Sequence, residues 1–156
     1  MGGLCVNFYR LESLDRPAPA EAFSGEGGLH AAGRWNSLGT RMVYASSSVA
    51  LACLETLTHM GAPRRLEERW LFTIEIPDNS IEEIADPPDG WDSEPAGAIS
   101  RVVGDKWVRE ERSVALLVPS VIVPMETNAL INPRHPKFRL AWVKTRKHFR
   151  FDSRLQ

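Results

Sequence analysis

Three residues with complementary chemistry follow one another in the first third of the chain. Arg34 lies in the segment Gly33-Arg34-Trp35-Asn36, Tyr44 follows ten positions later, and Glu55 ends the segment Ala50-Leu51-Ala52-Cys53-Leu54-Glu55. An arginine fork can pair with a pyrophosphate, an aromatic ring can stack on a flat base, and a carboxylate can stabilise a ribosyl cation. Together these residues would suit a dinucleotide such as NAD. Each also has an ordinary structural explanation, because most glutamates on helices are solvated.

The composition is that of an ordinary soluble protein. The chain has 156 residues, of which 43% are hydrophobic and 25% charged, and its net charge is -1. This length predicts one domain over residues 1–156, with a hydrophobic core large enough to be stable without disulfide bonds or a structural metal ion. No apolar run approaches the ~18 residues of a membrane span, and the first apolar stretch contains Asn7 and Arg10. We therefore expect a cytoplasmic protein with no signal peptide, whose two cysteines, Cys5 and Cys53, are reduced core residues.

Hydrophobic periodicity outlines the elements that must position these residues. Strands are predicted over residues 4–11, 41–45, 70–76 and 141–151. Residues 114–123 are almost continuously apolar but contain Pro119-Ser120, which predicts two strands or one strand broken at a bulge. Helices are predicted from the serines at 46–48 to about His59, and over 99–112. Loops are predicted over 15–32, 84–96 and 128–136.

The helix that carries Glu55 can be divided into two faces. Its predicted buried stripe consists of apolar residues at helical spacing: Val49, Ala50, Cys53, Leu54 and Leu57. Glu55 falls on a second stripe with Ser48, Ala52 and His59. The small residues on this second stripe leave room beside the carboxylate, as a ligand pocket at the edge of a core would require. The second predicted helix is expected to point Ile99, Val102, Val103 and Trp107 inward.

Charge is unevenly distributed along the chain. Residues 134–156 hold eight Lys or Arg against one acidic residue, whereas residues 66–95 hold ten acidic residues against one arginine. One interpretation is a basic tail that binds nucleic acid. The other, which we prefer, is that the two stretches lie near each other or face solvent separately. The basic stretch also carries Leu140, Trp142 and Phe149, which is typical of a packed element.

Several motif classes are excluded. The segment 25–28 is rich in glycine but lacks the lysine of a P-loop and the strand-to-helix context of a dinucleotide fingerprint. No Cys/His spacing suits zinc. The five tryptophans are far apart in the sequence, which favours core positions over a stacking platform for bases.

Five separate segments carry a resemblance to a known family. They are Phe23-Ser24-Gly25-Glu26-Gly27, the segment 33–36, Val43-Tyr44-Ala45-Ser46, the segment 50–55, and Val118-Pro119-Ser120 with Asn132-Pro133-x-His135-Pro136. In this order they resemble the RES domain family, which is named for an arginine, a glutamate and a serine. That family supplies toxins of type II toxin-antitoxin modules, usually beside an Xre-like antitoxin.

The resemblance implies an NAD-consuming enzyme with an α+β fold similar to that of ADP-ribosyltransferases, with a small split β-sheet core and flanking helices. Arg34, Tyr44, Glu55 and Ser120 match the family's site residues, and Arg10 is a further candidate for a phosphate contact. One departure is Ala32, since the family often has a second glycine before Gly33. The antitoxin is expected to occlude the NAD site, and nucleic acid is expected to be contacted only through the antitoxin.

The mechanism that the resemblance implies assigns one role to each residue. Arg34 would pair with the pyrophosphate, Tyr44 would stack on the nicotinamide or its ribose, and Glu55 would stabilise the oxocarbenium-like charge. Ser120 would hold the ribose or nicotinamide, while its ordinary explanation is a hydroxyl satisfied by the local backbone. No metal is required, because nicotinamide leaves NAD as a neutral group. Inorganic phosphate, water or a protein side chain could accept the ADP-ribosyl unit; we favour phosphate or water, with ADP-ribosylation of a protein as the alternative.

Overall fold

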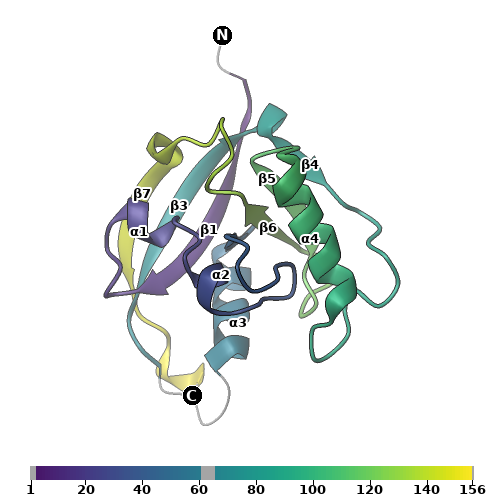
Figure 1. Cartoon of the computed structure of the whole chain (residues 1–156). Coiled ribbons are helices and arrows are strands. Elements are labelled where there is room, and N and C mark those ends of the chain that lie inside the picture. The colour runs from purple at the N-terminus through teal and green to yellow at the C-terminus, as the bar shows by residue number, and fades with distance from the viewer. Residues whose placement is uncertain (1–2, 61–65, 156) are drawn as a thin grey trace.

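Seven strands form one mixed sheet in the computed structural model, which describes residues 3–60 and 66–155 (Figure 1). The strands are β1 (Cys5–Ser13), β2 (Val43–Ser46), β3 (Arg69–Pro77), β4 (Ile81–Glu83), β5 (Ala115–Pro119), β6 (Thr127–Ile131) and β7 (Val143–Phe149). Their order across the sheet is β4-β5-β6-β2-β1-β3-β7. Neighbouring strands are antiparallel except for β4 and β5, which are parallel.

The sheet is almost divided in two between β1 and β2. These strands are paired at one position, Tyr9 opposite Ser46. By contrast, β1 pairs with β3 along its whole length, and β2 pairs with β6 along its whole length. Two well-formed ladders therefore meet at a narrow seam, which confirms the α+β class with a split sheet.

Helices lie on both sides of this seam. They are α1 (Pro19–Ala22), α2 (Gly27–His30), α3 (Val49–Met60) and α4 (Ala98–Glu110), with short 3-10 turns at Asp78–Ser80, Leu140–Trp142 and Ser153–Leu155. The hydroxyl of Ser48 accepts a hydrogen bond from the backbone N–H of Leu51 (3.1 Å) and so caps the start of α3. α3 packs against β1 and β2, and α4 lies beside β5 and β6 (Figure 1).

Alternate residues of β5 and β6 serve two hydrophobic clusters. Ala115 and Ala129 belong to a cluster that includes Phe8, Phe72 and residues of β2, and Phe23 from the segment after α1 packs edge-on against Phe72. Leu116 and Leu130 point to the other face, into a cluster with Trp35 and Trp107. α4 and the loop that contains Trp35 thus share one core.

The contact between α4 and that loop requires a glycine. A Cβ on Gly104 would lie 1.7 Å from the backbone oxygen of Trp35. The hydroxyl of Ser100 donates to the carbonyl of Arg34, and Nε of Arg101 donates to the carbonyl of Gly33 (2.9 Å). The start of α4 therefore fixes the backbone on both sides of Arg34.

The predicted faces of both long helices were wrong in part. On α3, Leu57 is buried as expected, but Ala50 is exposed and Leu54 is 42% exposed, whereas Leu51 and Ala52 are buried. The side of α3 that carries Ala52 and Glu55 faces the sheet, because small residues permit a close approach. On α4, Ile99 and Val102 are exposed, and the inward positions are Ser100, Gly104 and Trp107.

Other expectations also need correction. The predicted loop at 128–136 begins as β6, and residues 121–123 form a turn rather than a strand. The predicted loop at 15–32 contains the one-turn helices α1 and α2. Cys5 is exposed and Cys53 is half-buried, so neither is a full core residue; both are free thiols.

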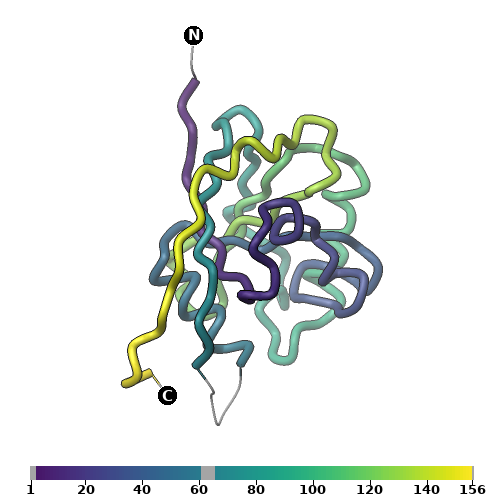
Figure 2. The backbone as a smooth tube through the Cα atoms, turned by 90° about the vertical axis from the view of Figure 1, so that its left-hand side faces the viewer, coloured from purple at the N-terminus to yellow at the C-terminus, as the bar shows by residue number. Residues whose placement is uncertain are grey.

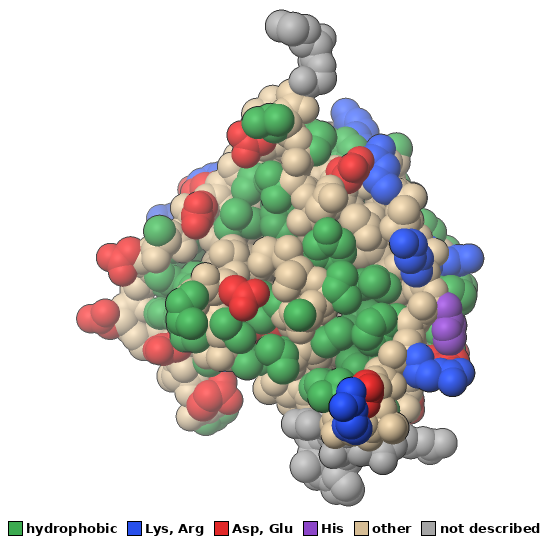
Figure 3. Space-filling model, turned by 180° about the vertical axis from the view of Figure 1, so that it is seen from behind, with side chains coloured by type: hydrophobic (Ala, Val, Ile, Leu, Met, Phe, Trp, Pro, Cys, Tyr) green, Lys and Arg blue, Asp and Glu red, His purple; other side chains and the backbone are tan. Residues whose placement is uncertain are grey.

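The basic stretch near the C-terminus is an ordered edge of the sheet. β7 runs alongside β3 (Figure 2), which contains Glu75 and directly follows Glu68. Lys144 pairs with Glu75, and both His148 and Arg150 contact the carboxylate of Glu68. Viewed from behind, Lys and Arg side chains gather along this edge of the molecule (Figure 3). The first part of the acidic stretch, with Glu68 and Glu75, therefore lies next to the basic stretch, whereas its later part begins with β4 at the opposite edge of the sheet. None of the helices in the described part of the chain has both the length and the apolar composition to span a membrane.

Candidate active site

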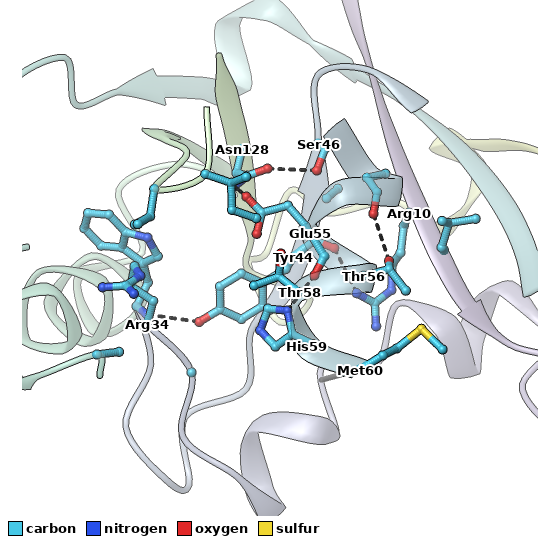
Figure 4. Close-up of a pocket in the computed structure, with 18 of the residues that line it drawn as sticks. Arg10, Arg34, Tyr44, Ser46, Glu55, Thr56, Thr58, His59, Met60 and Asn128 are labelled. Carbon is cyan, nitrogen blue, oxygen red and sulfur yellow. Dashed lines mark hydrogen bonds between the residues drawn. The ribbon is translucent and has the colours of Figure 1, made fainter. Parts of the chain in front are cut away.

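A cavity of about 850 Å³ opens at the seam between the two halves of the sheet. This volume falls within the range of roughly 300–1,000 Å³ that is typical of small-molecule sites. Its walls come from β1, β2, α3, the loop before Trp35, the segment before α4 and the start of β6. Four of the residues singled out in the sequence line it: Arg10, Arg34, Tyr44 and Glu55 (Figure 4).

Glu55 is held at the cavity wall by two side chains from the far half of the sheet. Its Oε1 accepts a hydrogen bond from the hydroxyl of Ser120 (2.8 Å) and another from the amide of Asn128 (2.6 Å). Because both donors meet the same oxygen, they fix the rotation of the carboxylate and leave Oε2 free of hydrogen bonds from the described residues. Oε2 is therefore the oxygen available to a ligand.

Ser120 lies behind Glu55 rather than at the cavity surface. Its side chain is fully buried, and its hydroxyl accepts hydrogen bonds from the backbone N–H groups of Ile122 and Val123 (both 3.1 Å). These bonds orient the hydroxyl so that its proton points at Glu55. The family resemblance implies that Ser120 holds the ribose or nicotinamide, and that role stays a prediction; in the structure its hydroxyl donates to Glu55.

Arg34 already holds an anion. Its Nη1 donates to the backbone carbonyls of Trp91 (3.0 Å) and Ser93 (2.9 Å), and its Nη2 pairs with the carboxylate of Glu94. The arginine side chain is only 17% exposed, whereas that of Glu94 is 73% exposed. The two carbonyls therefore fix the guanidinium, while the glutamate can leave without disturbing the core.

Tyr44 connects its strand to the loop that carries Arg34. Its hydroxyl donates to Oδ1 of Asn36 (2.6 Å) and accepts from the backbone N–H of Trp35 (3.1 Å). Burial raises the pKa of this phenol well above its ordinary value, so Tyr44 stays protonated and offers a ring face rather than a base. A Cβ on Gly33 would lie 2.5 Å from the Tyr44 hydroxyl, so the glycine is what lets the loop approach the ring.

Arg10 is engaged by the protein itself. Its guanidinium donates to the carbonyls of Ala22 (2.9 Å) and Tyr44 (2.8 Å) and pairs with Glu12 (2.8 Å). These contacts tie β1 to β2 beside the seam, where the backbone ladder between the two strands is short. The geometry thus gives Arg10 a structural role alongside its place in the cavity wall.

Comparison with known proteins shows the family of the chain. Residues 7–153 match the RES domain. The chain belongs to the RES domain family. It is 42% identical over 157 residues to a "Prs ADP-ribosylating toxin" of Sphingobium sp. (strain YBL2), a match that covers 97% of this chain and 98% of that one. It is also 42% identical over 140 residues to a "Toxin Res" of Yersinia enterocolitica, covering 88% of this chain and 92% of the relative.

A solved structure agrees with the RES domain fold. A chain of the M. tuberculosis MbcT-MbcA toxin-antitoxin complex superimposes with a TM-score of 0.71, covering 95% of this chain and 86% of that one. The two sequences are 17% identical over the match. At this level the likeness establishes the fold.

Two residues that line the cavity, Asn128 and Arg101, were not predicted from the sequence. Asn128 was assigned to a loop, although its neighbours Ala129, Leu130 and Ile131 form an apolar run that signals a strand. Arg101 was read only as part of a helix. Its Nε is fixed by the carbonyl of Gly33, and its side chain lines the cavity. Its terminal amino groups have no hydrogen-bond partner among the described residues, so they can meet an anion.

Proposed function

We propose that this RES domain protein is the toxin of a toxin-antitoxin pair and that it breaks the bond between nicotinamide and ribose in NAD. The observation that carries the proposal is the carboxylate of Glu55, held by two donors at the wall of a cavity lined by arginines. A fixed carboxylate beside cationic groups suits a ligand that combines a pyrophosphate with a ribose whose anomeric carbon becomes positive.

Arg34 and Arg101 are the groups that we assign to the pyrophosphate. The guanidinium of Arg34 is positioned by two backbone carbonyls and carries a displaceable carboxylate, that of Glu94, in the place of a ligand anion. Arg101, on α4, donates from its Nε to the carbonyl of Gly33, the residue before Arg34. Two arginines that share one rigid support can meet two phosphates without a large loss of side-chain entropy.

Glu55 acts at the reacting carbon. As the bond from ribose C1′ to the nicotinamide nitrogen breaks, its electron pair goes to nicotinamide, which leaves as a neutral molecule. The oxocarbenium-like charge that develops on the ribose is stabilised by Oε2 of Glu55. The ring of Tyr44, whose hydroxyl is occupied by Asn36 and Trp35, supplies a flat surface for the nicotinamide or its ribose.

The acceptor that we propose is inorganic phosphate or water. Phosphate would give ADP-ribose 1″-phosphate and water would give ADP-ribose, each with release of one proton. The test is to incubate the purified chain, without antitoxin, with NAD in the presence and absence of phosphate and to identify the products. NAD that stays intact under every condition, with folded protein, would refute the proposal.

A second candidate is transfer of ADP-ribose to a protein side chain. It is favoured by the relative that is 42% identical over 97% of this chain and carries the name "Prs ADP-ribosylating toxin". Adenylate-labelled NAD added to a cell lysate separates the candidates, because transfer would label protein bands whereas phosphorolysis and hydrolysis would leave the label in small molecules. Nicotinamide is released in all three cases.

The proposed partner is an Xre-like antitoxin that covers the cavity. The structural neighbour comes from a toxin-antitoxin complex, and several relatives are named as toxins. Co-expression with the product of an adjacent reading frame, followed by purification through a tag on this chain, would recover the pair. An NAD assay on that complex should show less nicotinamide release than the free chain.

A further inference from the structure

Asn128 occupies a distinctive place beside the proposed catalytic carboxylate. It lies on β6 directly opposite Ser46 of β2, and its side chain lines the cavity (Figure 4). Its amide nitrogen donates to Oε1 of Glu55 (2.6 Å), and its amide oxygen accepts a hydrogen bond from the hydroxyl of Ser46 (2.8 Å). Three side chains from two strands and a helix thus form one hydrogen-bonded chain.

The chemistry of these groups allows the amide only one orientation. An ionised carboxylate can only accept, so the amide nitrogen must face Glu55. The amide oxygen then faces Ser46, whose hydroxyl is free to rotate and donate. Ser46 is only 3% exposed, so water competes little for its proton. The serine therefore holds the amide in the orientation that the glutamate needs.

We infer that Asn128 is a positioning residue for Glu55, and that Ser46 acts through it. Asn128 and Ser120 together occupy Oε1, so that Oε2 is directed at the ribose. This inference rests on the proposed function, because it requires Glu55 to act on the ribosyl cation.

If Asn128 only stabilised the fold, its substitution would have a different effect. Loss of its hydrogen bonds would then lower the melting temperature without a selective effect on the chemical step. Replacement of a positioning residue should instead lower kcat and leave KM for NAD nearly unchanged, because Oε2 is needed in the transition state more than in the ground state.

The test is steady-state nicotinamide release by the purified chain and by three variants. Asn128→Asp keeps the size of the side chain but replaces the donor with an acceptor, and should lower kcat by about 10- to 100-fold, with KM within about threefold of wild type. Ser46→Ala should lower kcat by about three- to tenfold in the same pattern. Asn79→Asp, at an exposed position on the turn before β4, adds the same charge and should leave both constants unchanged.

A double-mutant cycle tests the order of the hydrogen-bonded chain. If Ser46 acts only through Asn128, then Ser46→Ala combined with Asn128→Ala should be no slower than Asn128→Ala alone. Thermal unfolding of each variant identifies any loss of folded protein, and the conservative Ser46→Ala keeps the test valid should an Asn128 variant not fold.

The outcomes separate this inference from the proposed function. If the wild type turns over NAD and Asn128→Asp has the same kcat, the positioning role is overturned but the proposed function is not. The same holds if Asn128→Asp changes only KM. Additive losses in the double mutant would overturn the dependence of Ser46 on Asn128. Absence of NAD turnover in the folded wild type would refute the proposed function itself.

Discussion

Gly104 provides a sharp test of how the fold supports the site. It lies in the middle of α4 with its α-carbon against the loop that carries Arg34, and a Cβ there would lie 1.7 Å from the backbone oxygen of Trp35. Real Cβ atoms essentially never approach another atom closer than 3.0 Å. In the Gly104→Ala variant α4 and the loop must therefore separate by about 1 Å or more.

The size of the effect follows from two opposing terms. Helix propensity alone predicts that Gly104→Ala stabilises the protein by about 1 kcal/mol. Overpacking against a backbone atom costs about 1–3 kcal/mol, and separation also weakens the hydrogen bonds from Ser100 and Arg101 to the loop, at about 1 kcal/mol each. We expect a net loss of about 2–4 kcal/mol, which lowers the melting temperature of a chain of this size by roughly 4–16 °C.

The assay is thermal unfolding followed by circular dichroism, together with nicotinamide release below the melting transition. Gly27→Ala is the matched control, because a Cβ on Gly27 would meet nothing within 4 Å. We expect Gly104→Ala to lose stability and activity together, since displacement of the loop moves Arg34. A stability equal to or above that of the wild type would refute the packing argument.

Two further predictions concern single side chains of the site. Removal of the charge in Glu94→Gln should lower KM for NAD about two- to fivefold with kcat unchanged, because the carboxylate competes with the ligand for Arg34. Asp92→Asn in the same segment is the control. An unchanged or higher KM in Glu94→Gln would contradict the competition. Because burial raises the pKa of Tyr44 above its ordinary 10.0, the unfolded chain releases this proton first as the pH rises above that value. The free energy of unfolding should therefore fall more steeply for the wild type than for Tyr44→Phe between about pH 9 and 11 in urea titrations, and parallel curves would argue against a buried, neutral phenol.

The elements with strong local patterns could be predicted from the sequence. β3 alternates strictly, so Phe72, Ile74 and Ile76 are all buried as its period requires. β6 was missed because Asn128 and the later Asn132-Pro133 are turn residues that conceal the short apolar run between them. The three-residue β4 is too short for its pattern to be recognised.

The division of α3 into faces could not be predicted, for a physical reason. The buried residues Leu51, Ala52 and Leu57 do not all fall on the predicted apolar stripe, because apolar residues occur around most of the helix and hydrophobicity alone does not select one side. What decides is the contact with the seam of the sheet, where Ala52 is small enough for close approach and Glu55 finds donors on β6 and at the end of β5. A tertiary contact thus overrides the amphipathic pattern.

The site shows the same limit. Arg34, Tyr44 and Glu55 could be selected by residue type and by family resemblance, and the structure brings them to one cavity. Asn128 and Arg101 could not be selected, because Asn128 resembles a turn residue and Arg101 is one of many arginines, placed on a predicted helix with no motif around it. Their importance comes from a register between strands and from the position of α4, which exist only in the folded chain.

The central claim is that Glu55 drives cleavage of NAD. Glu55→Gln is the decisive variant, since a glutamine can still accept from Ser120 and Asn128 through its oxygen and should keep the fold and melting temperature. The measurement is nicotinamide released from NAD over time by the wild type and by Glu55→Gln. We predict steady release by the wild type and a loss of about 100-fold or more in the variant. Equal release by the two folded proteins would contradict the account.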